Sequence, residues 1–238
     1  MTDDVLLEHA RRLWATLAAA PVTVSTSAVE VAVSPRSSLC PPGWVGIVVV
    51  GNAAIATAPD GNAAELVRQA LNSLPAAART DPAGVCARLP IIETLGPATL
   101  AYCDTAGFRP GESGAVQTSP ADHADLAALL ARVPAEDAAE AGLDEITSPA
   151  FVVRSGPEII AAAGYQAWPR DTAHLSVLTA PVARGRGLAR VVAAAAVADA
   201  LRAGLLPQWR ARPAASRRVA EALGFRELGS QLSVRLTP

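Results

Sequence analysis

Three arginines and two glycines crowd one short stretch of the chain, VARGRGLARVV at residues 182–192. Arginine supplies positive charge and hydrogen-bond donors, and glycine lets the backbone approach a bulky anion closely. The stretch follows an apolar run that ends at Thr179-Ala180-Pro181 and precedes an alanine-rich segment that predicts a helix over about 188–203. Because Pro cannot continue a central strand and a helix N-terminus carries free N–H groups, this order predicts an anion-binding turn. A solvated bend is the alternative interpretation.

Positive charge is concentrated around this turn. All 20 basic residues are Arg, and eight of them fall between Arg184 and Arg218 against one acid, Asp199, in a chain of net charge −2. An arginine-rich composition explains the absence of Lys but not this clustering, which indicates an anionic ligand or an acidic partner. The small overall charge gives no general attraction to nucleic acid or to membranes, so we expect neither as a partner.

Two common phosphate-binding motifs do not fit the turn. A dinucleotide-binding G-x-G-x-x-G/A motif that starts at Gly185 would need a small residue where Arg190 stands. A P-loop needs Lys, which the chain lacks. The remaining possibility is a turn that presents consecutive backbone amides to a pyrophosphate.

The turn resembles the R/Q-x-x-G-x-G/A motif of the GNAT superfamily of acetyl-CoA-dependent N-acetyltransferases, through the six residues RGRGLA at 184–189. Downstream, SRRVAEALGFRELGSQLSV at 216–234 is similar to that family's later helix, Gly-Phe pair and closing strand. The resemblance extends over roughly residues 120–238. It implies acetyl-CoA as the co-substrate, and no metal is expected.

The resemblance also implies a set of cofactor-binding residues. The loop itself would hold the pyrophosphate, the preceding strand would pair with the pantetheine arm, and a serine on the later helix would touch CoA. These residues are Arg184, Gly185, Arg186, Gly187, Leu188 and Ala189 in the loop, Val177, Leu178 and Thr179 on the strand, and Ser216.

Two residues are predicted to take part in the chemistry. His174 lies early on the strand before the motif, near where related enzymes carry a glutamate base, and an ordinary imidazole titrates near neutrality. Glu140 lies on an acidic segment that forms a substrate wall in the family; a solvated helix face is the alternative for it and for its neighbours. Many members carry a tyrosine general acid where this chain has Ala220, so the acid is unassigned.

Hydrophobic periodicity predicts a mixed α/β fold, with a GNAT-like C-terminal half and a related or smaller α/β N-terminal domain. A Gly-, Pro- and Ser-rich stretch at 105–121 suggests domains at 1–118 and 119–238. The segment AIATAPDGNAAELVRQAL at 54–71 is a weak echo of SVLTAPVARGRGLARVV at 176–192, without its arginines. The N-terminal domain is therefore a candidate degenerate copy that cannot hold an anion in this way.

The predicted elements follow the chain in this order. Helices are expected at 4–19, 61–74, 121–133, 188–203 and 215–223, with an acidic stretch at 135–146. Strands are expected at 22–33, 43–59 (a hairpin turning at Gly51-Asn52), 98–104, 151–155, 158–168, 173–179, 205–211 and 229–236.

The cysteine content and the N-terminal residues indicate the expected cellular location of the protein. Three cysteines at wide spacing suggest neither a disulfide framework nor a metal-ligand pair. The acidic N-terminus lacks the features of a signal peptide, and a cytoplasmic protein is expected. The sheet edges of such folds often pair, which leaves a homodimer open.

The function expected from these observations is acetyl transfer from acetyl-CoA to a primary amine of a small molecule by direct attack. Two alternatives remain at this point. One is a CoA-binding regulatory or structural protein without transferase activity, which the missing tyrosine would fit. The other is an acyltransferase that acts on a protein amine.

Overall fold

A computed structural model describes residues 3–22, 29–111 and 115–237. The chain has a mixed α/β fold and divides into two compact units, Met1–Leu100 with Glu227–Pro238, and Ala101–Arg226. This division differs from the predicted boundary near residue 118, because the last strand belongs to the first unit although it follows the second unit in sequence. The residues of a strand do not reveal which distant strands it pairs with, so this long-range pairing was not visible in the sequence.

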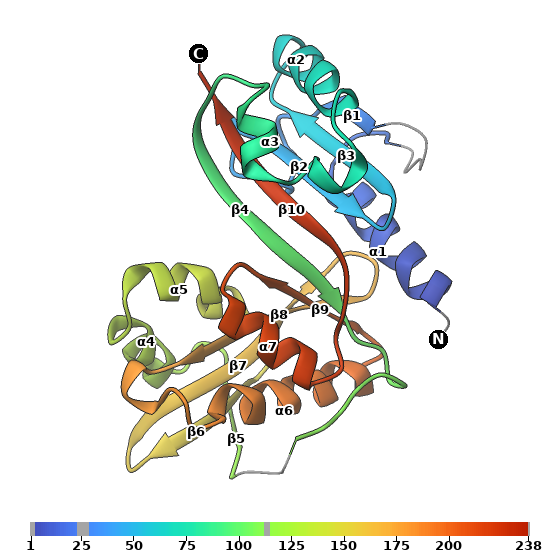
Figure 1. The fold of residues 1–238 in the computed structure, drawn as a ribbon. Coiled ribbons are helices and arrows are strands. Elements are labelled where there is room, and N and C mark those ends of the chain that lie inside the picture. The colour runs from blue at the N-terminus through green and yellow to red at the C-terminus, as the bar shows by residue number, and fades with distance from the viewer. Residues whose placement is uncertain (1–2, 23–28, 112–114, 238) are drawn as a thin grey trace. The chain divides into compact units, whose positions relative to one another are not determined.

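The first unit has helices on a five-stranded sheet with the strand order β1-β3-β2-β10-β4 (Figure 1). Its helical elements are α1 (Asp3–Leu17), α2 (Gly61–Asn72), the 3-10 turn η1 (Ala76–Ala78) and α3 (Pro82–Cys86). Its strands are β1 (Val29–Val33), β2 (Val45–Val50), β3 (Ala53–Ala58), β4 (Ile91–Tyr102) and β10 (Arg226–Leu236).

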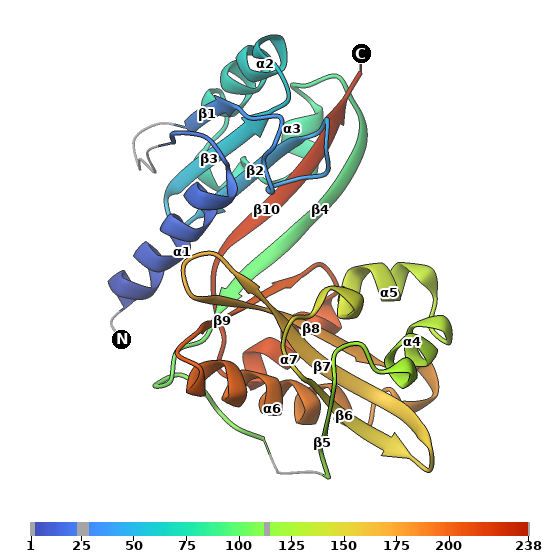
Figure 2. The same cartoon turned by 180° about the vertical axis from the view of Figure 1, so that it is seen from behind.

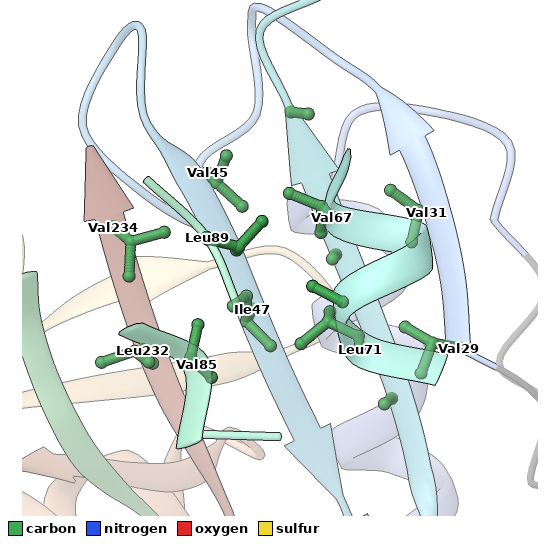
Figure 3. Close-up of a cluster of buried hydrophobic side chains, with 14 of the residues drawn as sticks. Val29, Val31, Val45, Ile47, Val67, Leu71, Val85, Leu89, Leu232 and Val234 are labelled. Carbon is green, nitrogen blue, oxygen red and sulfur yellow. The ribbon is translucent and has the colours of Figure 1, made fainter. Parts of the chain in front are cut away.

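Side chains on the two faces of this sheet pack into two separate apolar layers. On one face, Val67 and Leu71 of α2 and Val85 of α3 pack over the strands, and Figure 3 shows them with their strand partners. On the other face, Trp14 of α1 lies against the intervening strand residues, among them Val48. The period-two alternation along β2 therefore places successive valines in different layers.

The second unit contains the predicted anion-binding turn, in a sheet with the order β4-β9-β8-β7-β6-β5. Its helical elements are α4 (Ala124–Ala131), α5 (Ala135–Ala141), η2 (Leu143–Glu145), η3 (Pro181–Ala183), α6 (Leu188–Arg202) and α7 (Ala214–Ala222). Its strands are β5 (Gln117–Ser119), β6 (Ala150–Ser155), β7 (Glu158–Trp168), β8 (Thr172–Thr179) and β9 (Leu206–Ala211), with the last residues of β4.

Two helical layers cover opposite faces of this second sheet (Figure 2). Ala173 and Leu175 of β8 join a core with α6 and α7, whereas Leu178 joins a core with α4 and η2. By the same alternation, His174 and Ser176 lie on the α4–α5 face, and the Ser176 hydroxyl donates to the Gly142 carbonyl at 3.0 Å. On β9, Trp209 and Ala211 point into the α6–α7 core, which leaves Gln208 and Arg210 on the face of His174.

Most predicted elements correspond to observed ones. The predicted hairpin turns at Gly51-Asn52 between β2 and β3, and the strand–turn–helix order from 173 to 203 is as expected. The strand predicted at 22–33 overlaps β1, while residues 23–28 lie outside the described residues. Strand β4 begins seven residues before the predicted start at 98, because Gly96-Pro97 interrupts the pattern but not the strand. In the described part of the chain, no helix is long and apolar enough to cross a membrane.

Candidate active site

The turn between β8 and α6 leaves its backbone open. Gly187 is the N-cap of α6 with φ +75° and contributes no side-chain cap, and Gly185 also has φ +75°. A Cβ added to either glycine would meet no atom within 4 Å, so both are needed for their backbone conformation and not for lack of space. The amides of Leu188 and Ala189 at the start of the helix are therefore available to an anion.

The arginines of the loop have different surroundings. Arg184 is exposed, and its guanidinium donates to the Asp137 carboxylate of α5 at 2.7 Å and to the Thr179 carbonyl at 3.4 Å. Arg186 is also exposed and forms no ion pair with the described residues. A pyrophosphate at this turn would meet Arg186 directly but would have to share Arg184 with Asp137.

Strands β8 and β9, which precede the turn and follow α6, separate along part of their length. Strand β8 pairs with β7 along its whole length but with β9 only at Thr172–His174, opposite Leu206–Gln208. The predicted pantetheine-binding residues Val177, Leu178 and Thr179 lie beyond the last β8–β9 pair. Every second residue of a strand directs its backbone groups to the same edge, so this edge of β8 can pair with an extended ligand.

Two buried polar atoms beside the separating strands have no partner among the described residues. One is the Thr179 hydroxyl, near the end of β8, and the other is the amide nitrogen of Gln208, opposite His174 in the last pair. Such atoms are costly in a folded protein unless a ligand or water satisfies them. By the alternation along the strands, the Gln208 amide lies on the face of His174 and the Thr179 side chain lies on the opposite face, so the two atoms do not form one ligand site. The open turn and the unpaired edge of β8 are the features that suit a CoA-like molecule.

Ser216 and Ala220 lie on α7, which packs against β9. The indole of Trp209 donates to the Ser216 hydroxyl at 2.9 Å, which leaves the hydroxyl proton free for another acceptor. Ala220 is 3% exposed and packs in the α6–α7 core, so the position of the family's tyrosine holds no acid. Tyr165 does not replace it, because its hydroxyl donates to Asp199 of α6 and burial, followed by that bond, raises its pKa to about 12.

His174 is held firmly in the last β8–β9 pair. Its ring stacks on Trp168 with centroids 4.0 Å apart at 13°, and its Nδ1 lies 2.5 Å from the Gln208 Oε1. Burial of the imidazole, followed by the positive charge of Arg210, lowers its pKa to about 3. The structure thus places His174 beside the separating strands as predicted, but this pKa opposes the predicted role of proton acceptor, since the ring stays neutral and is a weak base.

Glu140 is not a free carboxylate. It lies on α5 and accepts from the Arg212 backbone amide at 3.1 Å and from the Arg212 guanidinium at 2.5 Å. Both carboxylate oxygens are thereby engaged by one residue at the end of β9. The structure does not bring Glu140 and His174 together as a catalytic pair. Glu140 instead forms an ion pair with Arg212, which neither the catalytic prediction nor the alternative of a solvated helix face anticipated.

Sequence reasoning missed two residues of this region. Gln208 is fully buried and fixes the imidazole, and the available signal was a polar residue inside the apolar strand LLPQWRA. Asp137 binds Arg184, which lies 47 residues later in the chain. The local sequence does not distinguish Asp137 from the acidic residues beside it. Two tryptophans of this region have different surroundings: Trp168 lies against His174, whereas Trp209 packs edge-on against Phe225 in the core.

The corresponding turn of the first unit is closed. It also runs from a strand, β3, to a helix, α2, but here Asp60 is the N-cap and its carboxylate accepts from the Ala63 amide at 2.9 Å. An acid at this position occupies the amide that an anion would use and repels negative charge. Of the two echoed turns, the one before α6 is therefore the open one.

Comparison with known proteins finds a family match for one segment of the chain. Residues 148–230 match the family model described as GNAT acetyltransferase. A search of curated proteins finds no match.

Several solved structures resemble the chain. A putative GNAT-family acetyltransferase from Novosphingobium aromaticivorans is 22% identical, with a TM-score of 0.50, over 60% of this chain and 65% of that one. A GNAT-family acetyltransferase from Colwellia psychrerythraea is 14% identical, with a TM-score of 0.48, over 67% of this chain and 63% of that one. A putative acetyltransferase from Salmonella typhimurium, solved with its cofactor acetyl-CoA, is 21% identical, with a TM-score of 0.38, over 52% of this chain and 95% of that one.

The chain thus covers less than two thirds of the first two of these structures, and the likeness to the first is one of fold. The matched segment begins just before β6 and ends within β10, so it contains the open turn, the separating strands β8 and β9, and α7. The family match therefore concerns residues 148–230, less than half of the chain, and it supports the GNAT superfamily for this segment.

Proposed function

We propose that the protein transfers an acetyl group from acetyl-CoA to a primary amine of a small molecule. The observation that carries the proposal is the uncapped start of α6 beside an unpaired edge of β8. The loop residues 184–189 would hold the pyrophosphate, and Val177–Thr179 would pair with the pantetheine arm. Ser216 would contact CoA from α7. When bound, acetyl-CoA supplies the activated acyl group as a thioester.

The residues of this chain would act by binding and orienting. The α6 amides and Arg186 neutralise the pyrophosphate, and the separation of β8 from β9 directs the thioester toward the α4–α5 face, where His174 lies. A backbone N–H on the free edge of β8 would stabilise the oxyanion of the tetrahedral intermediate. Because Ala220 offers no acid, the thiolate would leave without protonation by that position.

A CoA-binding protein without transferase activity is the second candidate, favoured by Ala220 and by the low basicity of His174. Release of free CoA thiol from acetyl-CoA, measured across a panel of small primary amines, separates the two. The transferase proposal expects amine-dependent thiol release that Arg186→Glu abolishes, while Arg36→Glu, an exposed arginine of the first unit, leaves it unchanged. Binding of acetyl-CoA without turnover on any amine would select the second candidate, and turnover only on protein amines would move the acceptor to that class.

We also propose that the protein is cytoplasmic and binds neither nucleic acid nor membranes. Its sheet edges would allow a homodimer. We further propose that catalysis belongs to the second unit and that the first unit is a non-binding copy; the boundary predicted from the sequence, between residues 118 and 119, falls inside the second unit.

A further inference from the structure

Given the proposed function, His174 and Gln208 bear on the kind of amine that the site accepts. His174 and Gln208 face each other in the last pair before β8 and β9 separate. Both lie on the α4–α5 face, and the thioester proposed above would lie next to this pair. The protonation state of His174 therefore determines whether this pair can take a proton from the incoming amine.

The hydrogen bond with Gln208 defines the state of the imidazole. The Gln208 Oε1, 2.5 Å from Nδ1, can only accept a hydrogen bond, so Nδ1 carries the proton. The lone pair is then on Nε2, which has no hydrogen-bond partner among the described residues. Stacking on Trp168 fixes the plane of the ring. The side chain thus presents one hydrogen-bond acceptor in a fixed direction.

The charged groups around His174 oppose a second proton. Arg210, two residues along β9 on the same face, is positive and has no ion-pair partner among the described residues. The carboxylate of Glu140 is engaged by Arg212 and gives the imidazole no counterion. Glu145 of η2 interacts with Arg210 through its charge and is exposed. The described surroundings of the ring therefore favour the neutral form down to acidic pH, with a pKa of about 3.

We propose that the acceptor is a weakly basic amine that arrives neutral, and that His174 orients it by accepting an N–H hydrogen bond at Nε2 without removing its proton. Gln208 is then a positioning residue that acts through His174. The amine lone pair forms the N–C bond at the thioester carbonyl, and collapse of the intermediate breaks the C–S bond, whose electrons leave with sulfur. The surplus proton on nitrogen passes through water to the thiolate, giving amide and free CoA.

The size of the expected selectivity follows from ordinary amine pKa values. At pH 7.5, an α-amine with a pKa of about 7.7–8.0 is neutral about 200- to 300-fold more often than a lysine-like amine with a pKa of about 10.4. The higher intrinsic nucleophilicity of the more basic amine offsets part of this factor. We therefore expect kcat/KM at pH 7.5 to favour the weaker base by at least about tenfold.

Two acceptors of similar size test this expectation, glycinamide and n-propylamine, because the amide group lowers the basicity of the former. The measurement is thiol release against pH from 5 to 10. With each acceptor, kcat/KM should rise tenfold per pH unit up to that acceptor's own pKa. An inflection between pH 5 and 9 that stays at the same pH when the acceptor is changed would show an enzymic base and overturn the proposal.

A second arm does not depend on turnover. His174 should not titrate between pH 5 and 9 in the nuclear magnetic resonance spectrum, unlike an ordinary histidine. Gln208→Glu should raise its pKa into that range, whereas Gln117→Glu on β5 should not. Titration of His174 near pH 6.5 in the unaltered protein would overturn the proposal, whether or not the variant folds.

Glu145→Gln separates the proposal from a carboxylate base. We expect its kcat/KM to stay within about twofold of the unaltered protein at every pH, and a loss above about tenfold would assign the base to Glu145. If acetyl-CoA neither binds nor releases thiol, the proposed function fails, while the titration still reports the state of His174.

Discussion

Asp137→Asn should tighten the binding of CoA. In the structure, Asp137 holds the Arg184 guanidinium at 2.7 Å, and the two side chains are 38% and 49% exposed. A pyrophosphate at the α6 turn must compete with this carboxylate for Arg184. An exposed ion pair of this kind is worth about 0.2–1 kcal/mol, so its removal should lower the Kd for CoA by about 1.4- to 5-fold.

Titration calorimetry with CoA at low ionic strength measures this effect. Glu136→Gln is the matched control, since Glu136 is the exposed neighbour on the same helix and forms no ion pair with the described residues. In an Arg184→Gln background, Asp137→Asn should have no effect, because the shared partner is gone. An unchanged or higher Kd in Asp137→Asn alone would refute the assignment of Arg184 to the pyrophosphate.

Three further predictions concern the turns and the imidazole. Gly187→Ala should cost about 1–2 kcal/mol of unfolding free energy, because a side chain is strained at φ +75°, and should weaken CoA binding; urea denaturation and calorimetry measure the two effects. Asp60→Ala should cost about 1 kcal/mol through loss of the α2 cap, yet leave CoA binding unchanged, and weaker binding in this variant would place an anion in the first unit. Because the pKa of His174 is lowered from 6.5 to about 3, the unfolded chain takes up this proton first as the pH falls. Its contribution to stability is therefore complete above about pH 6.5 and decreases toward pH 3, and the urea midpoint should fall less between pH 7 and 5 in His174→Gln than in the unaltered protein.

Local patterns were sufficient for much of this fold. The strand, Thr-Ala-Pro, glycine turn and alanine-rich helix from 173 to 203 are encoded by neighbouring residues, and the structure has each in place. The open turn before α6 could be predicted because glycine conformation and helix-terminal amides are local properties. The Asp60 cap was equally local, since Asp before GNAAEL is an N-cap pattern, but it was not recognised.

Contacts between distant residues were not accessible in this way. Glu140 and Arg212 are 72 residues apart, and Gln208 meets His174 across 34 residues. These pairs decide which side chains are neutral, paired or free. The residue types alone therefore suggested a histidine base and a carboxylate of the substrate wall, where the structure has a weakly basic imidazole and an engaged carboxylate. The return of β10 to the first sheet is a pairing of the same long-range kind.

The central claim is that CoA binds at the start of α6, along the free edge of β8. Amide hydrogen exchange of the whole chain, with and without CoA, tests it most directly. We expect CoA to slow exchange in residues 177–179 and 185–189 and to leave the Asp60–Ala63 turn of the first unit unchanged. Unchanged exchange in both second-unit segments at saturating CoA, or protection confined to the first unit, would contradict the claim.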